Sequence, residues 1–165
     1  MYELSSVIND VYTLYPKIGR KIINPEEIEK YLSKLSFKLP KELHKLYFFT
    51  NGFDENIQFF GLGEFLTLEK AIVVSENIIK EIKYQKNWFP IMKLEESLLV
   101  VEGSSQQKLA KVYRFFLDDL ENRIDYQPKI IFHSLTELLV EHIRSYLSVR
   151  DLYDFDNLRQ KYIDL

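Results

Sequence analysis

Residues 39–54 read LPKELHKLYFFTNGFD, and this stretch predicts a short helix with a sharp start and a sharp end. Pro40 suits the first turn, because its φ is preset and it lacks an N–H that this turn would leave unpaired. Helical spacing recurs at Leu43, Leu46, Tyr47 and Thr50. Asn51-Gly52 favours a left-handed helix stop over a hairpin turn, because the preceding residues do not alternate apolar and polar. We therefore expect a helix over 40–50 and a positive φ at Gly52.

Two further helices are predicted upstream of this stretch. Apolar residues recur every three or four positions from Leu4, which predicts a helix that ends before Pro16. Asn24 is a favourable N-cap, and Pro25 takes the first helical position. The buried stripe that follows predicts a helix from about 25 to 36.

Two capping signals predict helices downstream. Thr67 with Lys70 gives half a capping box, and the apolar face that follows extends to about residue 84. Ser134 with Glu137 forms a Ser-x-x-Glu capping box that opens a helix to about residue 148. Residues 151–165 are expected to form a last short helix or a docked tail.

The sequence between these helices favours strands. Residues 53–66 suggest short strands or an irregular extended crossing, and Pro90 restricts the next segment to a strand edge or start. The apolar run 98–101 predicts a central strand, with 111–117 as its antiparallel neighbour. A further short strand is expected at 124–126. Gly61-Leu62-Gly63 lacks the third glycine of a dinucleotide fingerprint, so a phosphate loop is disfavoured.

Length and composition predict one domain and a cytoplasmic location. The chain has 165 residues, 46% of them hydrophobic, with 12 Phe and 11 Tyr, which is ample for a single core. With no cysteine, disulfides, thiolate nucleophiles and Cys-based metal sites are excluded. The N-terminal residues show no secretory signal, and no apolar run reaches the roughly 18 residues of a membrane helix.

The charge distribution bears on the kind of partner. The net charge is −3; residues 1–50 carry 8 Lys and Arg against 6 Asp and Glu, and residues 51–165 carry 14 against 19. An acidic larger part disfavours non-specific nucleic-acid binding, which needs a concentrated basic face. A basic protein partner remains open.

The ordered set of motifs resembles the SUKH superfamily, which takes in the yeast cell-wall-synthesis regulator of the Smi/Knr type and many bacterial immunity proteins. The resemblance covers roughly residues 25–148. It rests on the Leu39-Pro40 helix with Asn51-Gly52, on 61–66 leading to 68–71, on Trp88 with Pro90-Ile91, on the strands 98–101 and 112–117, and on 134–139. Phe53 departs from the family, in which another small residue often follows Asn-Gly.

The resemblance implies an α+β fold, a single domain with a mixed, mainly antiparallel sheet packed by helices. It also implies a non-catalytic protein that binds and neutralises a polymorphic toxin, with no cofactor. The alternative that it implies is a regulatory protein-interaction module in signalling or cell-envelope synthesis.

The sequence offers few residues for catalysis or metal binding. No histidine has a partner at zinc spacing, and Ser104-Ser105 lacks the pattern of a nucleophile elbow. His142 falls in the apolar stripe of its helix, so we expect a hydrogen-bonded core histidine, with a ligand role as the alternative. Trp88 is expected to be buried as a core anchor, with stacking on a ligand as the alternative.

Carboxylates next to predicted turns and strand ends are the candidate partner-binding residues. Clustered carboxylates suit a divalent cation or paired acid and base, but the alternating spacing of a calcium loop is absent. Such residues also raise the local negative potential and attract a basic target. The candidates for this acidic partner-binding face are Asp54, Glu55, Asp118, Asp119, Glu121 and Asp125.

Overall fold

The computed structural model of the protein describes residues 2–61, 63–77, 87–104, 106–118, 128–149 and 155–163. The described helices are α1 (Leu4–Leu14), α2 (Pro25–Leu32), α3 (Lys41–Phe49), α4 (Leu68–Asn77), α6 (Leu135–Val149) and α7 (Asp156–Tyr162). The described strands are β1 (Gln58–Phe59), β2 (Gly63–Phe65), β3 (Trp88–Lys93), β4 (Ser97–Glu102), β5 (Val112–Phe116) and β6 (Lys129–Phe132).

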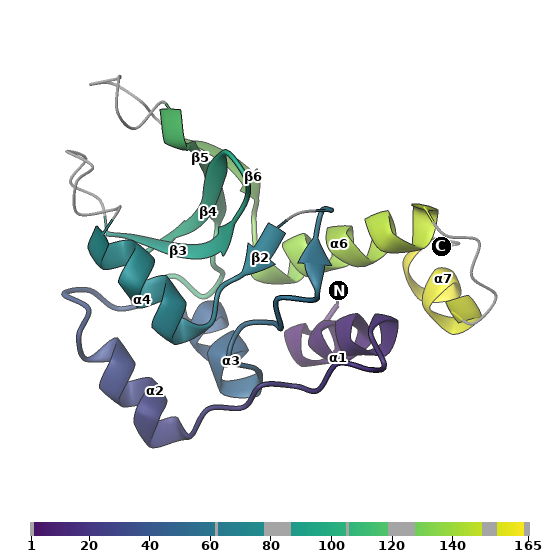
Figure 1. The fold of residues 1–165 in the computed structure, drawn as a ribbon, viewed down its shortest axis with the longest axis horizontal. Coiled ribbons are helices and arrows are strands. Elements are labelled where there is room, and N and C mark those ends of the chain that lie inside the picture. The colour runs from purple at the N-terminus through teal and green to yellow at the C-terminus, as the bar shows by residue number, and fades with distance from the viewer. Residues whose placement is uncertain are drawn as a thin grey trace.

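The described strands form one curled sheet in the order β1-β2-β3-β4-β5-β6, and every pair is antiparallel. Helices α1, α3 and α6 lie on one side of this sheet, and α4 packs beside β3 (Figure 1). The predicted α+β fold is therefore confirmed. Within the described residues the sheet is antiparallel throughout rather than mixed.

Most predicted elements are present, with shifted ends. Helix α2 ends at Leu32 rather than near residue 36. Beyond it, the backbone N–H groups of Lys34 and Leu35 donate hydrogen bonds to the carbonyls three residues earlier, a 3₁₀ pattern that does not continue the α-helix. The strand at β6 was not predicted. The strand expected at 124–126 and the expected end of α4 near residue 84 both lie outside the described residues.

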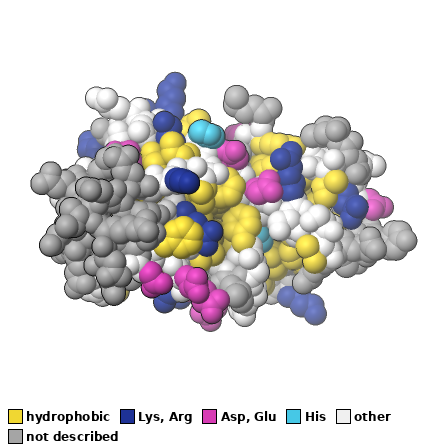
Figure 2. Space-filling model, turned by 90° about the horizontal axis from the view of Figure 1, so that it is seen from above, with side chains coloured by type: hydrophobic (Ala, Val, Ile, Leu, Met, Phe, Trp, Pro, Cys, Tyr) yellow, Lys and Arg dark blue, Asp and Glu magenta, His cyan; other side chains and the backbone are white. Residues whose placement is uncertain are grey.

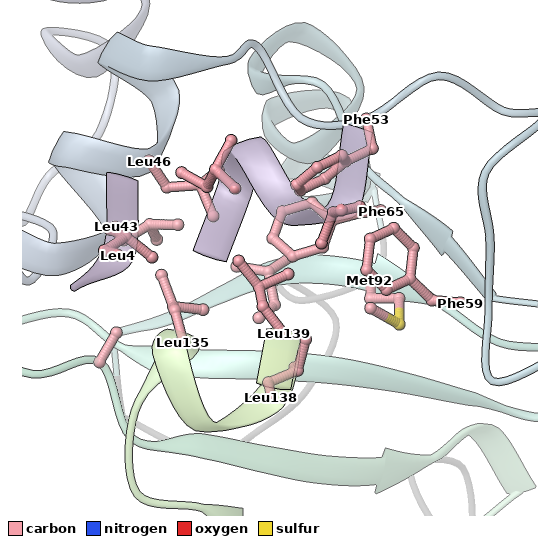
Figure 3. Packing of buried hydrophobic residues seen from close by; sticks show 14 of the residues in the cluster. Leu4, Leu43, Leu46, Phe53, Phe59, Phe65, Met92, Leu135, Leu138 and Leu139 are labelled. Atoms are coloured by element: carbon pink, nitrogen blue, oxygen red, sulfur yellow. The ribbon is translucent and has the colours of Figure 1, made fainter. Parts of the chain in front are cut away.

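The main core lies between the helices and the concave side of the sheet. Figure 3 shows leucines of α3 and α6 pointing toward the same space as aromatic residues of β1, β2 and the segment before them. The rings of Phe53, Phe59 and Phe65 form a cluster with centroids 5.0–5.6 Å apart. Burial of this apolar surface is the main favourable contribution to folding.

Strand β4 is buried on both faces, as its continuous apolar run predicts. Leu99 and Val101 contact the main core, whereas Leu98 and Val100 belong to a second cluster on the opposite face. Trp88 anchors that second cluster at 2% exposure, with its ring 4.9 Å from the Tyr113 ring. The expected burial of Trp88 is confirmed.

The C-terminal segment is a helix that docks on the N-terminal one. The Lys161 ammonium lies 2.5 Å from an Asp10 carboxylate oxygen, which also accepts a 2.6 Å hydrogen bond from the Tyr162 hydroxyl. The rings of Tyr2 and Tyr162 stack at 4.9 Å. The C-terminal segment was predicted to be either a short helix or a docked tail. Helix α7 is both, because it is helical and packs against the N-terminal residues.

The Asn51-Gly52 pair joins α3 to the start of α4. Gly52 has φ 67°, as predicted, but it lies two residues beyond Thr50, the C-cap of α3. The Asn51 side chain accepts a 2.8 Å hydrogen bond from the backbone N–H of Leu68 and donates to the Glu69 carboxylate at 2.9 Å. Asn51 therefore caps α4, the following helix, which satisfies one of its otherwise unpaired N–H groups.

A buried carboxylate fixes α3 against α6. Glu42 is 6% exposed and accepts backbone hydrogen bonds from Ala110 at 2.8 Å, Leu135 at 3.1 Å and Thr136 at 3.0 Å. The Thr136 hydroxyl adds a fourth bond at 2.8 Å. Glu42 thus caps α6 from another helix, and its negative charge favours the positive end of the α6 dipole.

Candidate partner-binding surface

The structure describes three of the six candidate acidic residues. Asp54 and Glu55 lie before β1, and Asp118 follows β5. Asp119, Glu121 and Asp125 lie outside the described residues. The grouping of all six on one surface stays a prediction.

Asp54 is half-buried and held in place by its neighbours. Its carboxylate accepts hydrogen bonds from the backbone N–H and side-chain amide of Asn56, at 3.0 and 2.7 Å, and lies 3.4 Å from the Lys21 ammonium. The Asn56 backbone hydrogen bond, followed by the side-chain bonds from Asn56 and Lys21, lowers the pKa of Asp54. Asp54 therefore orders its loop as well as presenting a charge.

Glu55 is more exposed, with 71% of its side chain accessible, and lies 3.9 Å from the Lys70 ammonium. Lys70 also pairs with Glu64, and that hydrogen bond is the main reason why its pKa is raised. One lysine thus pairs with two carboxylates, Glu55 and Glu64. The three side chains together keep a net negative charge, so the electrostatic potential around Glu55 stays negative.

Asp118 is exposed and has acidic neighbours that sequence reasoning did not associate with it. The backbone N–H of Leu117 donates a 3.0 Å hydrogen bond to the carbonyl of Glu96. This bond brings the end of β5 to the turn between β3 and β4, where Glu95 and Glu96 are both exposed. Only the pairing of β4 with β5 reveals this proximity, so the linear spacing carried no signal for it.

A groove of about 480 Å³ opens beside this turn, and we call it the acidic-rim groove. It is lined by Phe60, Leu94, Glu95, Glu96, Leu99, Arg114, Ile131 and Phe132. The rings of Phe60 and Phe132 stack at 6.1 Å, so the curl of the sheet brings the β1–β2 turn against β6. Figure 2 shows one face of the molecule, where hydrophobic side chains gather with basic and acidic ones around them.

Arg114 supplies the basic group in the lining of the acidic-rim groove. Its Nε donates a 3.0 Å hydrogen bond to the Ser97 hydroxyl, and its guanidinium lies 4.5 Å from the centroid of the Phe116 ring. Both contacts orient the guanidinium, and Arg114 is partly buried. Of the three charged residues in the lining, Glu95 and Glu96 are exposed, whereas Arg114 is not fully so.

A second hollow of about 270 Å³ lies on the other side of Phe60 and contains His142. His142 is 2% exposed; its Nε2 lies 3.4 Å from the Tyr15 hydroxyl and its ring 4.2 Å from that of Phe59. Burial lowers the pKa of His142 to about 4, so the imidazole is neutral at physiological pH. The expected hydrogen-bonded core histidine is confirmed.

The burial of neutral His142 predicts a loss of stability in acid. As the pH falls from 6.5 to about 4, the unfolded chain takes up a proton on this imidazole and the native protein does not. The free energy of unfolding should drop by about 3 kcal/mol over that range on this account alone. Urea denaturation at several pH values measures this drop.

One variant separates His142 from the other titrating groups. His142→Leu should flatten the pH dependence of the unfolding free energy between neutral pH and about 4.5. An unchanged slope in His142→Leu would show that His142 titrates normally in the native protein.

Within the described ranges, no group of three or more His, Asp or Glu side chains is arranged to hold a metal ion. In the same parts of the chain, no helix has both the length and the apolar character to cross a membrane. The acidic-rim groove combines exposed carboxylates with apolar side chains, a combination that suits protein recognition.

Comparison with known protein families identifies a match over most of the chain. Residues 22–141 match the sequence model described as the SMI1 / KNR4 family (SUKH-1). No curated protein matches the chain. The matched region begins just before α2 and ends within α6, so it includes the sheet, the Asn51-Gly52 junction and the lining of the acidic-rim groove.

Proposed function

The chain belongs to the SMI1/KNR4 (SUKH-1) family, and from that premise we propose that it is a cytoplasmic immunity-type protein that binds and neutralises a cognate bacterial toxin. The family includes immunity proteins and is generally non-catalytic. We propose likewise that this chain acts by binding alone, without a cofactor.

The observation that carries this proposal is the combination of exposed carboxylates with an open groove lined by both apolar and charged side chains. Glu95, Glu96 and Asp118 lie where the β3–β4 turn meets the end of β5, and the groove opens beside them. Many antibacterial toxins act on nucleic acid and so have basic substrate clefts. An acidic inhibitor surface can occupy such a cleft and exclude the substrate.

We propose further that the six candidate carboxylates contribute to the toxin-binding face. Asp118, Asp119, Glu121 and Asp125 follow one another along the chain after β5, and Asp54 with Glu55 precedes β1. Charges of this kind act mainly on the rate of association and on the choice of partner. Binding should therefore weaken as salt screens them.

The test is the affinity for a toxin encoded next to this protein, measured at rising salt. A variant with Asp118, Asp119, Glu121 and Asp125 changed to Asn or Gln should bind at least about tenfold more weakly at low salt and depend less on salt. The matched control replaces four exposed glutamates on or beside helices with Gln: Glu3, Glu27, Glu76 and Glu141.

The control separates local from overall charge, because both variants lose four negative charges. If affinity responds to neither the salt nor the substitutions after β5, the proposal that these carboxylates contribute to the toxin-binding face is wrong. If both variants weaken binding equally, net charge rather than this surface attracts the partner.

A further inference from the structure

Phe60, at the mouth of the acidic-rim groove, has an unfavourable backbone conformation. Its φ is 51°, and it is the one non-glycine residue with a positive φ in the described part of the chain. A bulky residue rarely adopts this region, because its Cβ crowds the following carbonyl. The Phe60 side chain is nevertheless 38% exposed and buries only part of its surface, against Phe132 and His142.

A second backbone irregularity lies in β6, which also lines the groove. Val112 pairs with Phe132 and Tyr113 pairs with Ile130, so Ile131 is an extra residue in β6. A bulge of this kind redirects side chains locally. Ile131 and Phe132 both line the acidic-rim groove, and Ile131 is 38% exposed.

These two features place exposed apolar side chains in the same groove at some cost to folding. Strained positions persist where the surrounding structure imposes them, and they concentrate at binding sites. Aromatic and aliphatic side chains in a partly exposed groove are the usual anchors for a partner's apolar side chain. The charge at the rim, from Glu95 and Glu96, complements a cation.

We propose that the acidic-rim groove binds an extended segment of the partner protein in which an apolar side chain lies next to Lys or Arg. The apolar side chain packs against Phe60, Ile131 and Phe132, and the basic one pairs with Glu95 or Glu96. This inference rests on the proposed function, because it names the part of the toxin that this surface recognises.

The proposal gives Phe60 an unusual response to substitution. Asn tolerates the left-handed region, so Phe60→Asn relieves the backbone strain while it removes the ring. The thermal midpoint should stay unchanged or rise, whereas binding of the segment should weaken at least about tenfold. A residue that only supports the fold would show the opposite pattern, a lower midpoint and unchanged binding.

Two blocked hexapeptides serve as probes, one alternating Lys with Leu and Phe, the other with Glu in place of each Lys. Titrated into ¹⁵N-labelled full-length protein, the lysine peptide should shift amide signals of groove residues and the glutamate peptide should not. Phe60→Asn and the double change Glu95→Gln with Glu96→Gln should each abolish these shifts. Phe48→Ala, at an exposed aromatic residue outside the groove, should keep them.

The proposal is overturned if neither peptide shifts groove signals at millimolar concentration, or if the shifts map elsewhere. It is also overturned if the protein forms a concentration-dependent dimer through the groove, because a second copy would then be the occupant. A failure with the peptides, alongside intact toxin neutralisation, would leave the proposed function standing and remove only this groove as its site.

Discussion

Gly52→Val is expected to lower the free energy of unfolding by about 4 kcal/mol, through backbone strain and crowding together. Gly52 has φ 67°, a region in which a β-branched residue is strained. A Cβ at this position would lie 2.4 Å from the carbonyl oxygen of Leu66 and 2.8 Å from the backbone nitrogen of Thr67. Neither atom is the end of a flexible side chain, so the segment that leads into α4 must shift.

Gly61 provides the matched control for Gly52. Its φ is 92°, and among the described residues other than its two chain neighbours no heavy atom lies within 4 Å of the position that a Cβ would take. Gly61→Ala therefore reports the backbone strain alone, about 1–2 kcal/mol. Gly52→Ala should cost clearly more, since it adds the clash with Leu66. Equal denaturation midpoints for these two alanine variants would refute the close approach at Gly52.

Glu42→Leu is expected to destabilise the protein by about 3–5 kcal/mol. The substitution keeps most of the side-chain volume but removes the acceptor for the N–H groups of Ala110, Leu135 and Thr136. Leu135 and Thr136 lie in the first turn of α6, where no carbonyl of the same helix can replace it. Chemical denaturation of the purified variant measures the loss.

Glu141→Leu is the control for Glu42→Leu, because Glu141 is an exposed glutamate on α6. It should change the free energy of unfolding by no more than about 0.5 kcal/mol. Glu42→Gln should fall between the two, since its amide retains one acceptor oxygen but presents a donor to N–H groups. A midpoint for Glu42→Leu equal to that of Glu141→Leu would show that the buried network contributes nothing to stability.

Local signals predicted the helices well because their partners are close in sequence. Asn24 caps α2 through the N–H of Glu26, and Ser134 caps α6 through that of Glu137. The capping role of Glu42 was missed, because its carboxylate accepts hydrogen bonds from N–H groups that are 68 to 94 residues away in the sequence. The role of Asn51 was missed for the same reason. The sequence predicts that Asn51 ends α3, whereas in the structure its side chain caps α4, 17 residues further along the chain.

The acidic-rim groove lay beyond sequence reasoning for a related reason. The β1–β2 turn meets β6 only because the sheet curls, and the bulge at Ile131 exists only relative to the register of β5. Glu95 and Glu96 were not among the candidate residues, since the contact that brings Asp118 near them is between strands. Carboxylates at strand ends could be named from the sequence, but not their neighbours.

Survival of cells that co-express this protein with a toxin encoded next to it tests the central claim most directly. The account predicts that cells producing the toxin survive only when this protein is present, and that the two purified proteins form a complex. Gly52→Val should protect less because less of the protein is folded. If cells die with every neighbouring toxin although the protein is folded and abundant, neutralisation is contradicted, and a regulatory interaction module becomes the better reading.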